Sequence, residues 1–276
     1  MVDIGVRLEG KVALVTGAAR GLGRAMTLGL AAHGARVGAM DRDADSPERM
    51  SLIEEASKYG RDSIVPLAGD ITDPAACERA VSALEAKLGK VDVLINNAGV
   101  GMELMGEFLH KPFKFYEVPV PIWQKIVDTN INGTFNMSRA VAPKMVSRGW
   151  GRIINVSGRL FVMLRKGLSP YGATKAALES ATAIWSSDLE GTGVTVNSLS
   201  PGGLVDTRMI PSTEFPDRKT LLRPEVMIPP TVWLASDRSD GTTGMRFTGK
   251  DWDLNLDPAK AAEKASLRAL VGETIA

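Results

Sequence analysis

Short apolar runs alternate with longer helical patterns along most of the chain. Most of these runs are continuous rather than alternating, which is typical of strands buried on both faces of a parallel sheet. Strands are predicted over residues 12–16, 36–40, 63–67, 91–96, 152–156 and 194–199, with a seventh over 245–248.

The segments between these runs carry helix start and stop signals. A first helix is predicted over residues 21–33, with Gly34 as its stop signal. Asp45 or Ser46 is suited to cap a second helix that begins at Pro47. Further helices are predicted over residues 73–89, 121–147, 169–189 and, near the C-terminus, 258–270.

Strand and helix repeat in turn without a linker or an internal repeat, an order typical of a doubly wound sheet. We therefore expect residues 1–276 to form a single Rossmann-like α/β domain, with about seven parallel strands, helices on both faces and a C-terminal tail over 257–276. Two long segments, 100–122 and 201–230, break this rhythm, and each follows a predicted strand. Open α/β sheets bind ligands at that end of their strands.

The composition narrows the possible partners and the compartment. The formal net charge is only +1, so we expect no nucleic-acid partner. The chain shows no signal-peptide pattern and no apolar run of about 18 residues, so we expect no membrane association. The single cysteine, Cys77, excludes a disulfide within the chain, which favours a cytoplasmic location. We interpret Cys77 as a packing residue and predict no metal site.

A glycine-rich turn follows the first predicted strand and begins the first helix. Residues 16–23 read Thr-Gly-Ala-Ala-Arg-Gly-Leu-Gly. Glycines permit a tight turn and a close approach to a pyrophosphate, and the helix N-terminus offers free N–H groups to the phosphates. The turn favours a dinucleotide site, although such turns also serve structure alone. The predicted cofactor contacts are Gly17, Arg20, Gly21, Leu22 and Gly23.

Asp41 follows the second predicted strand and bears on the choice of cofactor. A carboxylate there accepts hydrogen bonds from ribose hydroxyls and repels a 2′-phosphate, which favours NAD over NADP. Arg20 and Arg42 favour NADP, because either guanidinium could pair with that phosphate. The alternative interpretation of Asp41 is a solvated residue of an acidic turn.

Small and amide residues follow the third and fourth predicted strands. Asp70 and Ile71 could bracket an adenine ring. Residues 96–99, Asn-Asn-Ala-Gly, leave room for a cofactor, and their amides could join neighbouring strand ends. A plain strand-ending turn is the alternative. The predicted cofactor contacts are Asp70, Ile71, Asn97, Ala98 and Gly99.

Tyr171 and Lys175 begin the helical pattern that follows the fifth predicted strand. Residues four apart lie on one helix face, so the two side chains are neighbours. A free tyrosine has a pKa of about 10, and a nearby ammonium lowers it toward the range useful for acid–base catalysis. The lysine could also hold a ribose hydroxyl. Downstream of a glycine-rich turn, this pair predicts proton transfer beside a dinucleotide.

These motifs, in this order, resemble the classical short-chain dehydrogenase/reductase family. The matching elements are residues 16–23, Asp70, 96–99, Asn130, 171–175, Pro201, Gly202 and Thr207, which cover roughly residues 8–250. The resemblance implies a seven-stranded parallel sheet and a homotetramer or homodimer. It also implies hydride transfer between a nicotinamide cofactor and an alcohol or ketone.

The resemblance assigns a role to each matching residue. Tyr171 would be the general acid/base, and Lys175 would lower its pKa and bind the ribose. Asn130 would hold a water of the proton relay. Thr207 would bond the nicotinamide amide, next to the Pro-Gly pair at 201–202.

The chain departs from the family pattern at the serine. The family has Asn-x-Ser-Ser ahead of the tyrosine, and the second serine binds the substrate oxygen. Here residues 155–158 read Asn-Val-Ser-Gly. Counted back from Tyr171 without a gap, Gly158 takes the catalytic position. Ser157 takes it only if the strand end shifts by one residue, and is otherwise structural. Ser157 remains a candidate catalytic residue.

We expect an NAD(P)-dependent oxidoreductase that interconverts a secondary alcohol and a ketone. Phe108, Phe113, Met209 and Ile210 could wall an apolar substrate pocket, or else belong to the core or a subunit contact. Two alternatives stay open. One is an NADPH-dependent carbonyl reductase of a biosynthetic pathway, and the other is a nucleotide-binding protein with catalysis impaired at Gly158.

Overall fold

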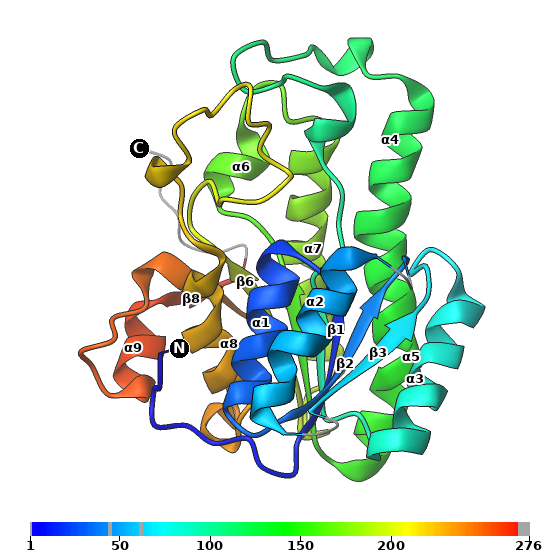
Figure 1. Cartoon of the computed structure of the whole chain (residues 1–276), viewed down its shortest axis with the longest axis vertical. Coiled ribbons are helices and arrows are strands. Elements are labelled where there is room, and N and C mark those ends of the chain that lie inside the picture. Colours follow the sequence, from blue (N-terminus) through cyan, green and yellow to red (C-terminus); the bar gives the residue numbers. More distant parts are fainter. Residues whose placement is uncertain (1, 44–45, 61–62, 270–276) are drawn as a thin grey trace.

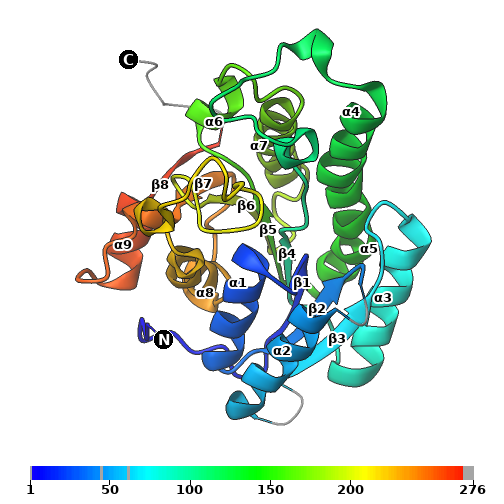
Figure 2. The ribbon, with the colours of Figure 1, turned by 45° about the horizontal axis from the view of Figure 1, so that its top comes forward.

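The computed structural model describes residues 2–43, 46–60 and 63–269. Its strands are β1 Val12–Thr16, β2 Arg36–Asp41, β3 Ile64–Ala68, β4 Val93–Asn96, β5 Gly151–Val156, β6 Val194–Ser200, β7 Met245–Thr248 and β8 Ser266–Arg268. They form one sheet in the order β3-β2-β1-β4-β5-β6-β7-β8 (Figure 2). The first seven run parallel, and β8 pairs with β7 antiparallel.

The strand order reverses between β1 and β4. From β1 the chain adds β2 and β3 on one side of the sheet, and then crosses to β4 on the other side. The connections that leave β1 and β4 therefore diverge and leave a crevice between them, which is where open α/β sheets bind ligands. The glycine-rich turn and the 96–99 turn both lie at this crevice.

Helices cover both faces of the sheet (Figure 1). One face carries α1 Gly21–Ala32, α2 Pro47–Ala56, α8 Ile228–Leu234 and α9 Pro258–Lys264. The other carries α3 Pro74–Leu88, α5 Gly133–Arg148 and α7 Tyr171–Asp188. Above the sheet in Figure 1, past the carboxyl ends of its strands, lie α4 Val120–Val127 and α6 Leu160–Leu164. Short 3-10 helices span Ser57–Tyr59, Met102–Met105, Phe115–Glu117, Arg218–Thr220, Pro224–Met227, Asp237–Ser239 and Gly249–Asp251.

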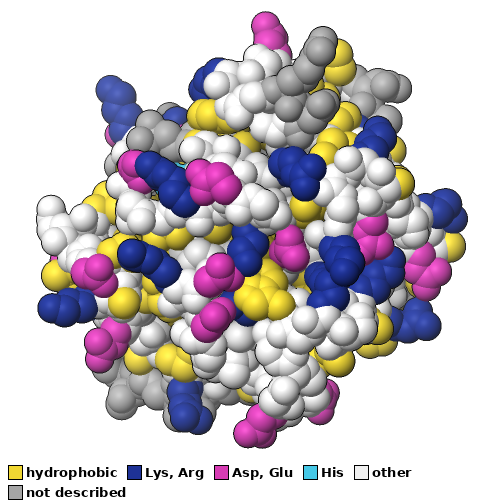
Figure 3. All heavy atoms as spheres, turned by 90° about the horizontal axis from the view of Figure 1, so that it is seen from below, with side chains coloured by type: hydrophobic (Ala, Val, Ile, Leu, Met, Phe, Trp, Pro, Cys, Tyr) yellow, Lys and Arg dark blue, Asp and Glu magenta, His cyan; other side chains and the backbone are white. Residues whose placement is uncertain are grey.

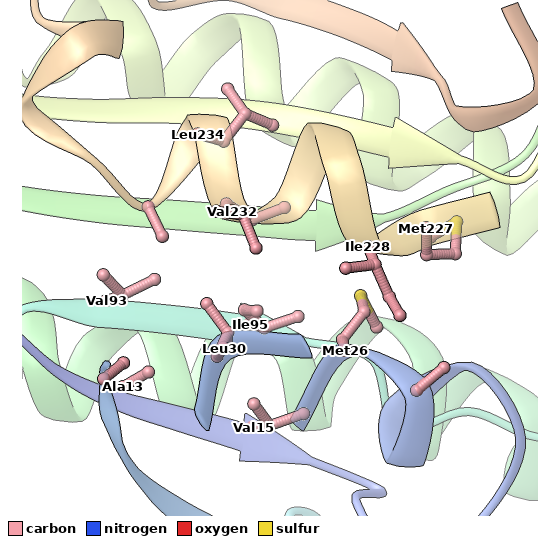
Figure 4. Packing of buried hydrophobic residues seen from close by; sticks show 14 of the residues in the cluster. Ala13, Val15, Met26, Leu30, Val93, Ile95, Met227, Ile228, Val232 and Leu234 are labelled. Atoms are coloured by element: carbon pink, nitrogen blue, oxygen red, sulfur yellow. The ribbon is translucent and has the colours of Figure 1, made fainter. Parts of the chain in front are cut away.

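Each face of the sheet has its own apolar core. On the first, Met26 and Leu30 of α1 and Val232 of α8 pack over Val15 and Ile95 of the central strands (Figure 4). On the second, the alternate side chains of the same strands meet α3, α5 and α7. This burial on both faces explains why the central strands form continuous apolar runs.

Cys77 of α3 lies within the second core and has no exposed surface. Burial raises the pKa of its thiol to about 11, so the thiol stays protonated and unreactive at neutral pH. The prediction that Cys77 is a packing residue is confirmed.

The described part of the C-terminal tail, up to residue 269, packs against the sheet and adds a strand to the predicted seven. Ala261 and Ala262 of α9 lie in the first core. The chain then leaves the helix at Lys264 and forms β8, so the predicted helix over 258–270 was too long, and residue 270 lies outside the described residues. A three-residue edge strand is too short to produce an apolar run, which is why the sequence did not predict it.

The predicted helix over 121–147 is also corrected. It is divided into α4 and α5 by one π-helical turn, Asp128–Asn132. Such turns interrupt the α-helical hydrogen bonds and occur frequently at functional sites. Asn130 lies within this turn. Elsewhere the predicted elements agree with the structure to within one or two residues at each end.

Ser46 caps α2 by accepting a hydrogen bond from the Arg49 N–H at 3.3 Å, while Asp45 lies outside the described residues.

Figure 3 shows basic and acidic side chains interspersed on one face of the molecule. Within residues 2–43, 46–60 and 63–269, each helix is too short or too polar to cross a membrane.

Candidate active site

The glycine-rich turn has the close packing expected of a phosphate-binding turn. Gly17 has a φ of 63°, which L side chains rarely adopt. A side chain at Gly23 would approach Gly17 O to 2.1 Å, so only glycine fits where α1 crosses the turn. Arg20 precedes α1, and its side chain makes no capping bond to the first N–H groups. The helix N-terminus therefore faces the crevice with donors suited to phosphates.

Amide and hydroxyl side chains tie the carboxyl ends of the central strands together. Asn97 Nδ2 donates to Thr16 O at 2.9 Å and to Gly17 O at 3.1 Å. Asn96 Nδ2 donates to Asn155 Oδ1 at 2.9 Å across to β5. These bonds fix the glycine-rich turn relative to the ends of β4 and β5.

Asp41 is held against the glycine-rich turn. Its carboxylate accepts a hydrogen bond from the Ala19 N–H at 3.2 Å and one from the Arg42 N–H at 2.9 Å. The carboxylate is therefore fixed at the end of β2, within the cleft wall, rather than solvated in a loose turn. Arg42 Nη1 lies 3.9 Å from Asp70 Oδ2, so the Arg42 guanidinium forms an ion pair with the Asp70 carboxylate.

One cleft of about 1230 Å³ runs along this crevice. Its size exceeds the usual 300–1,000 Å³ of a drug-sized pocket, which suits a cofactor and a substrate together. Predicted site residues that line it are Gly17, Arg20, Gly21, Leu22, Asp41, Asp70, Ile71, Asn97, Ala98, Gly99, Ser157, Tyr171, Lys175, Pro201 and Thr207. Three other predicted site residues, Gly23, Asn130 and Gly202, do not line this cleft.

Tyr171 and Lys175 lie on the first turns of α7, side by side in the cleft. Lys175 Nζ is 5.5 Å from the centre of the Tyr171 ring and donates to Val156 O at 2.8 Å. Burial lowers the pKa of Lys175 to about 8. We predicted that this ammonium lowers the pKa of Tyr171. In the protein itself, burial and then the nearby Glu103 carboxylate raise it instead.

Asn130 joins the loop after β4 to α7. Its Nδ2 donates to Val100 O at 2.9 Å and to Thr174 Oγ1 at 3.0 Å, and its Oδ1 accepts from the Val100 N–H at 2.9 Å. The side chain is almost fully buried. Asn130 thus fixes the backbone opposite Tyr171.

The Ser157 hydroxyl is engaged away from the reacting end of the cleft. Its Oγ donates to Glu179 Oε1 at 2.6 Å, and Glu179 is completely buried. Glu179 lies eight residues after Tyr171 on α7, about two helical turns further along. A side chain at Gly158 would instead meet Val162 at 3.4 Å and the Lys175 Cβ at 3.7 Å, which are ordinary contacts. The Ser157 hydroxyl is therefore committed to Glu179 rather than to the reacting end of the cleft.

Glu103 is a cleft residue that sequence reasoning missed. It lies in the 3-10 helix Met102–Met105, and its Oε1 accepts a hydrogen bond from the Gly101 N–H at 3.0 Å. Its Oε2 is buried and has no hydrogen-bond partner among the described residues. A single glutamate in an irregular segment carries no sequence signal for this position.

The two long segments after β4 and β6 meet above the cleft. Glu214 accepts hydrogen bonds from the N–H groups of Phe108, Leu109 and His110 at 2.6–3.0 Å. Phe108 is buried in a third apolar cluster against which Phe113 and Tyr171 pack. His110 is exposed. Sequence reasoning missed Glu214, because its partners are more than 100 residues away.

Arg218 orders the second of these segments. Its Nε donates to Asp206 Oδ1 at 2.6 Å, and its Nη2 donates to Thr207 O at 2.8 Å. These bonds hold Thr207 beside Gly21, where a side chain on the glycine would lie 3.2 Å from Thr207 Cγ2. Met209 and Ile210 follow and line the cleft, as the apolar-pocket interpretation required.

Comparison with known proteins agrees with this geometry. The family model for short chain dehydrogenases matches residues 11–215. The chain is 32% identical over 248 residues to a 3-oxoacyl-acyl-carrier-protein reductase of Thermotoga maritima, covering 87% of this chain and 96% of that protein. It is 35% identical over 214 residues to gluconate 5-dehydrogenase of Gluconobacter oxydans, covering 76% and 78% of the two chains.

A solved structure is similar over most of the chain. A crystal structure described as an NAD(P)-dependent gluconate 5-dehydrogenase from Beutenbergia cavernae superposes with a TM-score of 0.75 at 28% identity, covering 88% of this chain and 96% of that one. That crystal contains NADP at low occupancy.

The chain belongs to the short-chain dehydrogenase family. It is an NAD(P)-dependent oxidoreductase, and the doubly wound fold expected from its sequence is confirmed.

Proposed function

We propose that this protein interconverts a secondary alcohol and a ketone, with NAD(H) as the preferred cofactor and Tyr171 as the proton carrier. One observation carries the proposal: Tyr171 and Lys175 share a cleft with a glycine-rich turn that is built to receive a dinucleotide. The cofactor contacts are those predicted from the sequence, with the strand-end bonds of Asn97 holding the turn in place.

The cofactor's nicotinamide ring supplies or accepts the hydride. In reduction, the substrate oxygen gains negative charge and takes a proton from Tyr171. Tyr171 is protonated at neutral pH and so can donate this proton, but burial raises its pKa and makes the phenol a weaker acid than a free tyrosine. In oxidation Tyr171 must accept a proton, and the nearby ammonium of Lys175 stabilises the phenolate that forms.

The site lacks a side chain that would donate a second hydrogen bond to the substrate oxygen. The Ser157 hydroxyl is directed to Glu179, and Gly158 offers no side chain. Losing one donor to a developing oxyanion costs on the order of 10²–10³ in rate, so an enzyme without it remains active but slow. The family resemblance implies that Asn130 holds a water of the proton relay. Both amide hydrogens of Asn130 are donated to Val100 O and Thr174 Oγ1, so such a water would have to donate to an oxygen of this residue.

The preference for NAD rests on Asp41, whose carboxylate is fixed at the ribose end of the cleft. A 2′-phosphate would be repelled there. The competing proposal is an NADPH-dependent carbonyl reductase. Arg20 and Arg42 line the same part of the cleft and favour this competitor.

The test is a screen of secondary alcohols with NAD and NADP, and of ketones with the reduced cofactors, followed at the absorbance of the reduced nicotinamide. We expect turnover, and tighter binding of NADH than of NADPH. Asp41→Ala should reduce the difference in affinity between NADH and NADPH. If the wild type clearly prefers NADPH, the NADPH-dependent carbonyl reductase replaces the NAD(H)-dependent enzyme as the proposed function. If no combination of substrate and cofactor is turned over, both proposals are rejected.

We also propose that the protein is a cytoplasmic homotetramer or homodimer. Phe135 of α5 and Ile184 of α7 are half exposed, on helices that cover the same face of the sheet. Large exposed apolar side chains on one face of a molecule favour a protein contact there. The cytoplasmic location is supported by the single cysteine, which excludes a disulfide within the chain.

A further inference from the structure

Glu103 stands at the substrate end of the cleft but has no part in the reaction proposed above. It lines the cleft together with Tyr171, Lys175 and Met209. Its Oε1 is bonded to the Gly101 N–H, whereas its Oε2 is buried without a partner among residues 2–43, 46–60 and 63–269. A buried, unpartnered carboxylate oxygen is costly. Such a group is expected where a ligand completes its hydrogen bonds.

The unpartnered oxygen and the ring of Tyr171 both border the space next to Gly101. A side-chain atom placed on Gly101 would lie 2.9 Å from Glu103 Oε2 and 3.1 Å from Tyr171 Cδ2. The same atom would lie 3.4 Å from Met209 Sδ. The three side chains therefore converge on one point, and glycine at 101 leaves the carboxylate and the tyrosine close together.

The positions of Glu103 and Tyr171 determine which part of a bound substrate the Glu103 carboxylate can contact. The reacting oxygen of the substrate has to lie against the Tyr171 hydroxyl for proton transfer. Glu103 lies on the Cδ2 side of the same ring, so a substrate group that extends to that side from the reacting carbon would meet its carboxylate.

We propose that Glu103 selects the substrate by accepting a hydrogen bond from a hydroxyl group on the carbon adjacent to the reacting carbon. The substrate is then a vicinal diol in the oxidising direction and an α-hydroxy ketone in the reducing direction. This inference rests on the proposed function and narrows it to one substrate class.

The charges around Glu103 favour a neutral hydroxyl over other groups at that carbon. A carboxylate on the substrate would be repelled by Glu103. An ammonium group would add a cation next to Lys175 and the positively charged ring of the oxidised nicotinamide. A hydroxyl group donates to a carboxylate without adding either charge.

Matched substrate pairs test the inference. We would measure kcat/KM for butane-2,3-diol against butan-2-ol, and for 3-hydroxybutan-2-one against butan-2-one, with 3-aminobutan-2-ol as a third arm. A hydrogen bond to a charged group predicts that the wild type prefers the hydroxylated member about ten- to hundredfold. Glu103→Ala should abolish this preference by lowering only the rate with the hydroxylated member. Glu103→Gln, which keeps an acceptor, should retain part of it.

Glu107→Gln is the control, because Glu107 is an exposed carboxylate four residues away and should leave the preference unchanged. Equal losses on both members of a pair in Glu103→Ala would overturn the inference, since Glu103 would then act on the reacting oxygen or on folding. Equal rates in the wild type, or a faster amino alcohol, would overturn it too. Turnover of no compound would instead reject the proposed function, and the inference with it.

Discussion

At the residue scale, the position that separates this chain from its family pattern is Gly158. The backbone there does not need glycine, because an added side chain would make only ordinary contacts with Val162 and Lys175. Ser157, one residue earlier, is committed to the buried Glu179. We therefore expect substitutions at the two positions to differ in effect: one at Gly158 should change turnover, and one at Ser157 should change stability.

Gly158→Ser should supply the missing donor and raise turnover, by up to about 10²-fold. Ser157→Ala should leave turnover nearly unchanged but lower the free energy of unfolding by about 1–3 kcal/mol, because buried Glu179 loses a partner. Steady-state kinetics and denaturant unfolding separate the two effects. A large loss of turnover with intact stability in Ser157→Ala would return the catalytic role to Ser157.

The carboxylate of Glu103 should also set the pH dependence of oxidation. Its charge adds to burial in raising the pKa of Tyr171, so removing that charge lowers this pKa. Oxidation needs the phenolate, which forms as the pH rises through that pKa. In Glu103→Gln the rise of the oxidation rate with pH should therefore move to lower pH. A profile unchanged from wild type, or moved to higher pH, would contradict this assignment.

At the element scale, the sequence predicts well what local pattern determines. The parallel strands are buried on both faces and form apolar runs, and the glycine-rich turn and the Tyr171–Lys175 spacing are local signals. Contacts between distant segments leave no such signal. Glu214 holds a loop that lies more than 100 residues earlier, and β8 exists only because β7 offers an edge. Glu103 likewise reaches the site through an irregular turn.

Glu214 should govern the order of the loop above the cleft. Its pKa is lowered because three backbone N–H donors outweigh burial, which acts in the opposite direction. Glu214→Ala removes all three acceptor contacts, each of which involves a charged group. We expect KM for the substrate to rise at least about tenfold, with cofactor binding little changed. Glu107→Gln is the matched control, and an unchanged KM in Glu214→Ala would show that these bonds do not order the substrate site.

At the scale of the whole molecule, α5 and α7 present the surface for self-association. Ile184 is 56% exposed on α7, whereas Met50, which is 62% exposed, lies on α2 across the sheet. Ile184→Glu should shift the protein to a smaller species in light scattering, and Met50→Glu should not. A monomeric wild type would reject the proposed oligomer. Equal shifts in both variants would reject this face as the contact.

The central claim is that Tyr171 carries the proton in a cleft that binds NAD(H). Tyr171→Phe removes one hydroxyl and keeps the ring packed in its apolar cluster. The direct measurement compares turnover and NADH affinity of this variant with those of the wild type, on any accepted alcohol. We predict a loss of turnover of about 10²–10⁴-fold with NADH affinity nearly unchanged. Turnover close to the wild-type value would contradict the assignment of Tyr171, and a parallel loss of NADH binding would show that the ring serves structure rather than proton transfer.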